Sequence, residues 1–236
     1  MNDQESLRSP RVLGLFKFGG RAHMEELVTE GHVYMPPLSY FVELESDALR
    51  ADPAEGCARS VAADGFRLDV QVDGEWKPVG GIAGPVRFRD GTLLSANVYC
   101  TYALLDNGAA SLVDTRNYEF GDTYVVFTDG DEFLRRVRAA ASRLGVKLEA
   151  SLVEYVDETT YAGPMGIFRK YSSFAYQSEC RLALLPGTGA PYSLRLGDLS
   201  DIALIGPLAE LNTRIRIGHS DIELRVVSRD SGELKE

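Results

Sequence analysis

Hydrophobic residues in this chain gather in short runs separated by glycine, proline and acidic residues, and some of these runs alternate apolar with polar positions. Side chains on a β-strand alternate between its two faces, so this alternation predicts short, half-buried strands. The runs expected to form strands are Val12–Phe18, Val33–Met35, Tyr124–Thr128, Lys147–Val156, Phe174–Leu185, Ile202–Ile205 and Ile222–Val227. Another strand is expected within Thr92–Ala103, centred on Val98–Tyr102.

Two segments have helical spacing instead. A short helix is expected at Ala22–Glu30, with Gly31 as its stop, because glycine readily takes the left-handed conformation that ends helices. A longer amphipathic helix is expected at Gly130–Leu144. Asp129 and Glu132 are spaced as a capping box at its start, with Asp in place of the usual Ser or Thr.

A β-hairpin is expected between Phe66 and Trp76, because Asp73-Gly74 lies between two alternating segments. Few helices, many short strands and no regular βαβ units predict an α+β fold of mostly antiparallel strands, and disfavour a doubly wound sheet. A length of 236 residues suits one domain. The expected organisation is a disordered lead at residues 1–10, a single α+β domain at residues 11–228 and a frayed tail at residues 229–236.

The charge balance limits the classes of partner. A formal net charge of −10 and a pI of about 4.9 oppose non-specific binding to phosphate backbones. The basic residues of Arg135–Lys147 are expected on the solvated face of a helix. No apolar run is long enough to span a membrane, and residues 1–10 lack the apolar core of a secretory signal. No membrane association is therefore expected.

Cysteine and histidine usage limits the possible sites further. The three cysteines (Cys57, Cys100 and Cys180) are widely spaced and include no Cys-x-x-Cys pair. A disulfide framework is therefore not expected, and a reducing cytoplasm is the expected compartment. The three histidines have no ligand spacing, so no structural zinc site is predicted.

The densest set of chemically capable side chains lies near the C-terminal end of the chain. If Phe174–Leu184 is one strand, Gln177, Glu179 and Arg181 share a face, with Lys170 just upstream. One interpretation is the solvent face of an ordinary strand, with a weak, exposed Glu179–Arg181 ion pair. The other is a functional site.

Six short motifs occur here in an order that resembles a large, functionally uncharacterised bacterial family. They are Phe16-Lys17-Phe18, Asp52-Pro53-Ala54-Glu55, Tyr99-Cys100-Thr101-Tyr102, Phe168-Arg169-Lys170, Glu179-Cys180-Arg181 and Ile202-Ala203-Leu204-Ile205-Gly206. The resemblance covers nearly the whole chain but implies no activity.

The order of elements is also similar to the ADP-ribosyltransferase fold, and Gln177-Ser178-Glu179 is similar to the Gln-x-Glu signature of some of its members. This resemblance implies NAD as the substrate and Glu179 as the catalytic residue, which would stabilise the charge that develops as nicotinamide leaves. Gln177 would contact the ribose or the target. The residues expected to contact NAD are Lys17, Phe18, Thr101, Tyr102, Lys170 and Arg181.

Two function classes follow. The first is an NAD-dependent transferase that passes ADP-ribose to a protein or nucleic-acid target, in a toxin or in conflict between phage and host. The second is a non-enzymatic binding module in which Glu179 and Arg181 form a structural ion pair. A nuclease or phosphotransferase is a weaker third, because the sequence lacks clusters of histidine and carboxylate residues.

Overall fold

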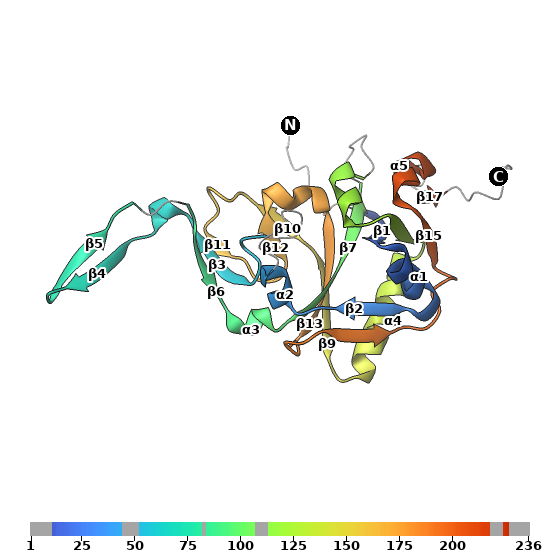
Figure 1. Ribbon diagram of the computed structural model, residues 1–236, viewed down its shortest axis with the longest axis horizontal. Helices are drawn as coiled ribbons and strands as arrows, with labels where there is room; N and C mark the ends of the chain where they lie inside the picture. The colour runs from blue at the N-terminus through green and yellow to red at the C-terminus, as the bar shows by residue number, and fades with distance from the viewer. Residues whose placement is uncertain (1–10, 44–51, 82–83, 107–112, 218–223, 227–236) are drawn as a thin grey trace, which may run out of the picture. The chain divides into compact units, whose positions relative to one another are not determined.

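The structure, a computed structural model, describes residues 11–43, 52–81, 84–106, 113–217 and 224–226 (Figure 1). The chain forms two compact units, each assembled from segments far apart in the sequence. The first unit contains Met1–His32, Thr101–Val137 and Arg195–Glu236, and the second contains Val33–Cys100 and Arg138–Leu194. The expected lead at residues 1–10 and tail at residues 229–236 lie outside the described residues.

The first unit is built on an antiparallel sheet with the strand order β15-β8-β1-β7. Its strands are β1 (Val12–Gly19), β8 (Thr123–Phe127), β15 (Ala203–Pro207) and the C-terminal half of β7 (Asn97–Leu105). The helices and remaining strands are α1 (Arg21–Glu30), η2 (Thr115–Phe120), α4 (Gly130–Arg143), which continues past the end of this unit, η4 (Leu208–Glu210), α5 (Leu211–Arg214), β16 (Ile215–Ile217) and β17 (Leu224–Val226).

A short unbroken apolar run, residues 124–127, lies in an interior strand of this sheet. Every residue of β8 is buried, as expected for a central strand covered on both faces. Phe16, Tyr124 and Val126 form a core cluster with Leu208 and Leu211 of the short helices. Phe127 stacks on Phe133 of α4 with the ring centroids 3.8 Å apart.

The second unit contains several small sheets. The strands are β3 (Cys57–Val61), β4 (Leu68–Val72), β5 (Glu75–Val79), β6 (Val86–Arg89), β9 (Lys147–Leu152), β10 (Glu154–Val156), β11 (Gly163–Pro164), β12 (Arg169–Tyr171) and β13 (Glu179–Leu185). The unit also contains β2 (His32–Met35) apart from its first residue and β14 (Tyr192–Arg195) apart from its last. Short helices lie at α2 (Leu38–Glu43), η1 (Ala63–Gly65), α3 (Gly91–Leu94) and η3 (Ser172–Gln177). β10 pairs with β12 in parallel. The pairs β3 with β6, β3 with β11, β4 with β5 and β9 with β13 are antiparallel.

The predicted α+β class with many antiparallel strands and few helices is confirmed. The Asp73-Gly74 hairpin is confirmed as β4 and β5. The stop at Gly31 is confirmed, with φ 61° and ψ 37°. The cap of α4 is confirmed in part: Asp129 Oδ1 accepts a hydrogen bond from the Glu132 backbone N–H at 2.8 Å.

The strand expected within Thr92–Ala103 and centred on Val98–Tyr102 is confirmed as β7. One strand prediction was wrong in its extent. The strand expected at Phe174–Leu185 begins only at Glu179. Ser172–Gln177 forms a 3₁₀ helix instead, and Ser178 ends it in the left-handed conformation with φ 40°. Alternating apolar residues did not distinguish a tight helical turn from a strand here.

No helix in the described part of the chain is both long enough and apolar enough to cross a bilayer.

Candidate functional site

A network of charged side chains is buried in the second unit. Lys170 extends from β12, Gln177 from the end of η3, and Glu179 and Arg181 from β13. Glu55 joins them from the turn that precedes β3. All five side chains are buried, and Arg181 is only 2% exposed.

Both carboxylate oxygens of Glu179 are engaged. Oε1 accepts a hydrogen bond from Lys170 Nζ at 2.6 Å. Oε2 accepts from the Arg181 guanidinium, with distances of 3.0 Å to Nη2 and 3.2 Å to Nε. The Glu179 residue is 8% exposed, and its backbone N–H donates to the Tyr155 hydroxyl at 2.9 Å. Lys170 and Arg181 thus engage both oxygens of the Glu179 carboxylate.

Arg181 bridges two carboxylates. Its Nη1 and Nη2 donate to the two oxygens of Glu55 at 2.8 Å and 3.1 Å, a bidentate arrangement that suits a guanidinium. Nη1 also donates to the Ile167 carbonyl at 2.7 Å. Glu55 and Arg181 are 126 positions apart in the sequence. The Glu55–Arg181 ion pair thus links the turn before β3 to strand β13.

Lys170 completes the network. Its Nζ donates to Gln177 Oε1 at 2.7 Å as well as to Glu179, and lies 4.0 Å from Glu55 Oε2. The same ammonium lies over the Phe174 ring, 5.4 Å from its centroid. A buried ammonium needs such compensation, because an isolated charge is costly to remove from water.

The charges of the network keep Lys170, Glu179 and Arg181 ionised. Burial alone would raise the pKa of Glu179, but the positive charges of Lys170 and Arg181 outweigh it and lower that pKa to about 2. Burial would lower the pKa of Lys170, but the negative charges around it, chiefly those of Glu179 and Glu55, together outweigh burial and raise that pKa. The pKa of Arg181 is likewise well above its usual range, in spite of burial, because of Glu55 and Glu179.

Asp52 lies beside this network and is less well compensated. Its Oδ1 accepts a hydrogen bond from the Ala54 backbone N–H at 2.8 Å. Among the buried side chains that the structure describes, its Oδ2 is the one polar atom with no hydrogen-bond partner. Burial, followed by repulsion from Glu55, raises the pKa of Asp52 to about 6.

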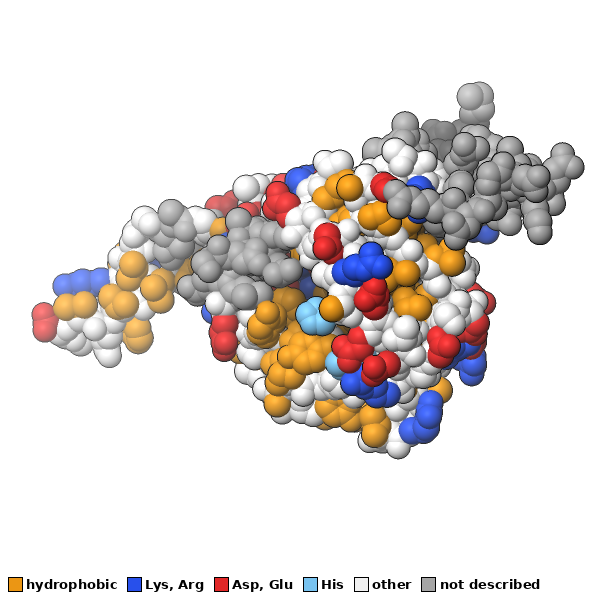
Figure 2. Space-filling view, turned by 45° about the vertical axis from the view of Figure 1, so that its right-hand side comes forward, with side chains coloured by type: hydrophobic (Ala, Val, Ile, Leu, Met, Phe, Trp, Pro, Cys, Tyr) orange, Lys and Arg blue, Asp and Glu red, His pale blue; other side chains and the backbone are white. Residues whose placement is uncertain are grey.

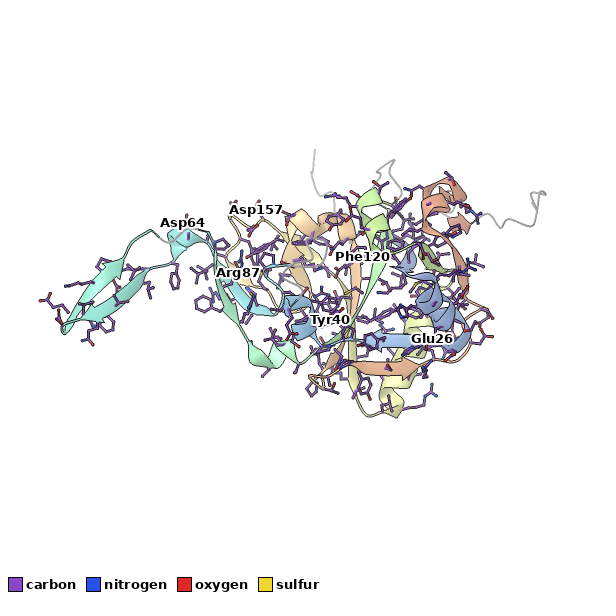
Figure 3. All side chains as sticks on the ribbon, viewed as in Figure 1. Glu26, Tyr40, Asp64, Arg87, Phe120 and Asp157 are labelled. Atoms are coloured by element: carbon purple, nitrogen blue, oxygen red, sulfur yellow. The ribbon has the colours of Figure 1, made fainter. Side chains whose placement is uncertain are left out.

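A second polar group lies in the same unit. The Tyr171 hydroxyl is 3.0 Å from Ser60 Oγ and accepts from Arg87 Nε at 3.1 Å. Arg87, labelled in Figure 3, also donates to Glu158 Oε1 at 2.8 Å. Since Tyr171 follows Lys170 on β12, this group flanks the network.

The structure brings together four of the residues that the sequence pointed to: Lys170, Gln177, Glu179 and Arg181. The interpretation of Glu179 and Arg181 as a weak, solvent-exposed pair was wrong, because β13 is buried on both faces. Gln177 reaches the network from the 3₁₀ helix and does not share a strand face with Glu179.

The other predicted residues lie in the first unit. Lys17 and Phe18 are on β1, and Thr101 and Tyr102 are on β7. The rings of Phe18 and Tyr102 have their centroids 5.6 Å apart, and Thr101 is buried. Burial raises the pKa of Tyr102 to about 12. Within their unit, Phe18 and Tyr102 are packing residues of the core.

Glu55 was missed as a site residue. The only signal for it in the sequence was the Asp-Pro-x-Glu segment, which carried a resemblance and no chemical role. Nothing local to Glu55 indicates that it meets Arg181.

All three cysteines are free thiols. Within the described ranges, no three His, Cys, Asp or Glu side chains are grouped so that they could hold a metal ion. Comparisons with protein-family models, curated proteins and solved structures found no match. The two resemblances stated from the sequence therefore stay predictions.

Proposed function

We propose that this chain is a non-enzymatic binding module, in which the Glu179–Arg181 pair is structural. The observation that carries this proposal is that both carboxylate oxygens of Glu179 already accept hydrogen bonds. The donors are Lys170 and Arg181, and Glu179 is only 8% exposed. A glutamate that stabilises charge on a ribose needs a free oxygen within hydrogen-bond distance of the substrate. Freeing Glu179 would take one buried countercharge away from both Lys170 and Arg181.

The net charge bears on the type of partner. At −10 the chain is repelled by phosphate backbones, so a protein partner fits it better than a nucleic acid. Exposed apolar side chains of β4 and β5 provide a surface on which such a partner could be bound.

One observation favours the NAD-dependent transferase instead. Ser178, a non-glycine residue with φ 40°, separates Gln177 from Glu179. Backbone in sparsely populated conformations is enriched at functional sites. In this second candidate NAD would be the substrate and Glu179 the catalytic residue, and the Lys170 and Arg181 contacts would have to open.

Glu179→Gln distinguishes the two candidates when nicotinamide release from NAD and thermal unfolding are measured together. For a structural pair we expect no release from the natural protein. We also expect a loss of roughly 3–5 kcal/mol in unfolding free energy for the variant, because Arg181 and Lys170 lose a buried countercharge. The matched control is Glu154→Gln, which removes an exposed partner of Arg169 and should cost below about 1 kcal/mol.

The opposite pattern would overturn the proposal. Release of nicotinamide by the natural protein, abolished in a Glu179→Gln protein that melts normally, would establish the transferase.

A further inference from the structure

The hairpin formed by β4 and β5 is a two-stranded sheet of its own in the second unit (Figure 1). Asp73 and Gly74 at its turn both have positive φ, 52° and 84°. These values match a type I′ turn, whose twist suits a two-residue hairpin. The Gln71 side chain donates to the Gly74 carbonyl at 3.3 Å and braces the turn.

The side chains of this hairpin are unusually apolar for their exposure. Directly opposed residues share a face, so the register places Leu68, Val70, Val72 and Val79 on one face and Trp76 on the other. All five are exposed, and Trp76 is 69% exposed. Figure 2 shows hydrophobic side chains along the hairpin, with acidic and basic ones at its outer end. An isolated two-stranded hairpin is marginally stable in water, so a surface of this kind indicates a partner.

No strand in the described part of the chain pairs with the outer edge of β5. In a hairpin closed by a two-residue turn, the flanking pair Val72–Glu75 is hydrogen-bonded, and the pairs then alternate along the ladder. The backbone N–H and C=O of Trp76 therefore point away from β4, as does the backbone of Pro78. Proline has no N–H to donate to a neighbouring strand, so pairing at this edge depends on the N–H and C=O of Trp76.

The charges on this edge are self-complementary. Glu75 and Lys77 flank Trp76 and lie on the same face as the aliphatic residues. If two β5 strands pair antiparallel about a two-fold axis at Trp76, the Glu75 of each copy faces the Lys77 of the other. The two Trp76 residues would then exchange both backbone hydrogen bonds, and their rings would stand side by side.

We infer that the β5 edge binds a second copy of this chain, forming a four-stranded sheet across a two-fold axis. The two Glu75–Lys77 contacts set the register, and the Trp76 rings lose exposure to water. The interface is limited to one short strand from each copy, so it is smaller than a standard protein–protein interface and the dimer is weak. Insertion into a membrane fits less well, because Asp73 and Glu75 carry charge at the turn.

This inference rests on the proposed function in that it names a second copy as the partner of the β4–β5 surface. Its test is separate from that of Glu179, because the hairpin contains no residue of the buried network. The assay uses the full chain at concentrations from about 1 μM to 1 mM, a range that covers weak association. Sedimentation velocity measures the mass, and Trp76, the only tryptophan of the chain, reports on the edge by its fluorescence. We expect a dimer that forms with concentration, together with a blue shift of the emission.

Charge variants test the register. Lys77→Glu and Glu75→Lys each place like charges opposite one another across the axis, and each should raise the dimer dissociation constant roughly tenfold or more. An equimolar mixture of the two variants restores opposite charges and should form a heterodimer. Asp69→Lys, on the other strand of the hairpin, is the control and should leave the dimer unchanged.

The inference is overturned if the chain stays monomeric up to about 1 mM and the Trp76 emission does not shift. A dissociation constant above about 1 mM would be too weak for a specific dimer. It is also overturned if a dimer forms that neither charge variant weakens, since that dimer would use another surface. Binding of a foreign extended peptide at Trp76 without self-association would replace the second copy as the occupant.

Discussion

Asp52 differs from the other buried charged residues because one of its carboxylate oxygens lacks a partner. Glu55 and Glu179 are each compensated by a cation within hydrogen-bond distance, whereas Asp52 receives only a backbone N–H. Its pKa is raised to about 6, and that of Glu179 is lowered to about 2. The two carboxyl groups therefore affect stability in opposite directions as the pH changes.

Asp52→Asn is expected to stabilise the protein near neutral pH. A carboxyl whose pKa is higher in the folded state contributes stability at low pH, and loses it as the pH rises from its unfolded value near 4 through about 6. Two pKa units correspond to about 3 kcal/mol. Asparagine keeps an oxygen for the Ala54 N–H and removes the charge. Denaturant unfolding should show a gain in the variant at pH 8 that is about twice the gain at pH 5, where the carboxyl is only partly ionised in the folded state.

The comparison between the two pH values contains its own control. An equal change in the unfolding free energy at pH 5 and pH 8 would mean that the carboxyl of Asp52 is not the titrating group.

At the scale of elements, the end of α1 depends on a single backbone conformation. Gly31 has φ 61°, a value that side chains disfavour, and its N–H bonds to the Glu26 carbonyl. A Cβ at this position would lie 2.3 Å from the Gly197 carbonyl oxygen. The helix stop thus also allows α1 to approach the backbone near Gly197.

Gly31→Ala should therefore lower the unfolding free energy by roughly 2–4 kcal/mol, from the left-handed backbone and the displaced carbonyl together. The control is Gly20→Ala at the start of the same helix, where φ is −70° and a Cβ meets nothing within 4 Å. Thermal melting of both variants gives the test. Equal melting temperatures of the two variants would contradict this prediction. They would show that the backbone near Gly197 can move to accommodate a Cβ at position 31 without loss of stability.

At the scale of the whole molecule, buried charge is distributed unevenly. The buried ionisable side chains with a formal charge near neutral pH that the described ranges contain are Asp52, Glu55, Lys170, Glu179 and Arg181. All five belong to the second unit. The described core of the first unit contains only neutral polar side chains among its apolar ones.

Acid should therefore loosen the second unit first. Glu179, with its lowered pKa, contributes stability above about pH 4.5 that is lost as the pH falls toward about 2. Hydrogen exchange between pH 5 and pH 2.5, corrected for intrinsic rates, should show earlier loss of protection in β13 than in β8. Simultaneous loss in both strands would mean that the two units unfold as one.

Local backbone chemistry explains what could be predicted from the sequence. Asp73-Gly74 and Gly31 act through dihedral angles that depend on the residue itself, so the hairpin and the helix stop were predicted correctly. The apolar period likewise indicated an α+β chain of short strands. Lys170, Gln177, Glu179 and Arg181 were recognised as a group because they lie within twelve positions of one another.

Only the tertiary structure decided what those residues do. Periodicity reports that one face of a segment is apolar, but burial of the second face depends on what packs against it, and β13 is buried on both. The pairing of Glu55 with Arg181 joins positions 126 apart, for which no local pattern exists. The Glu179–Arg181 ion pair, which the sequence pattern placed at the surface, is buried because such long-range contacts exclude water from both charges.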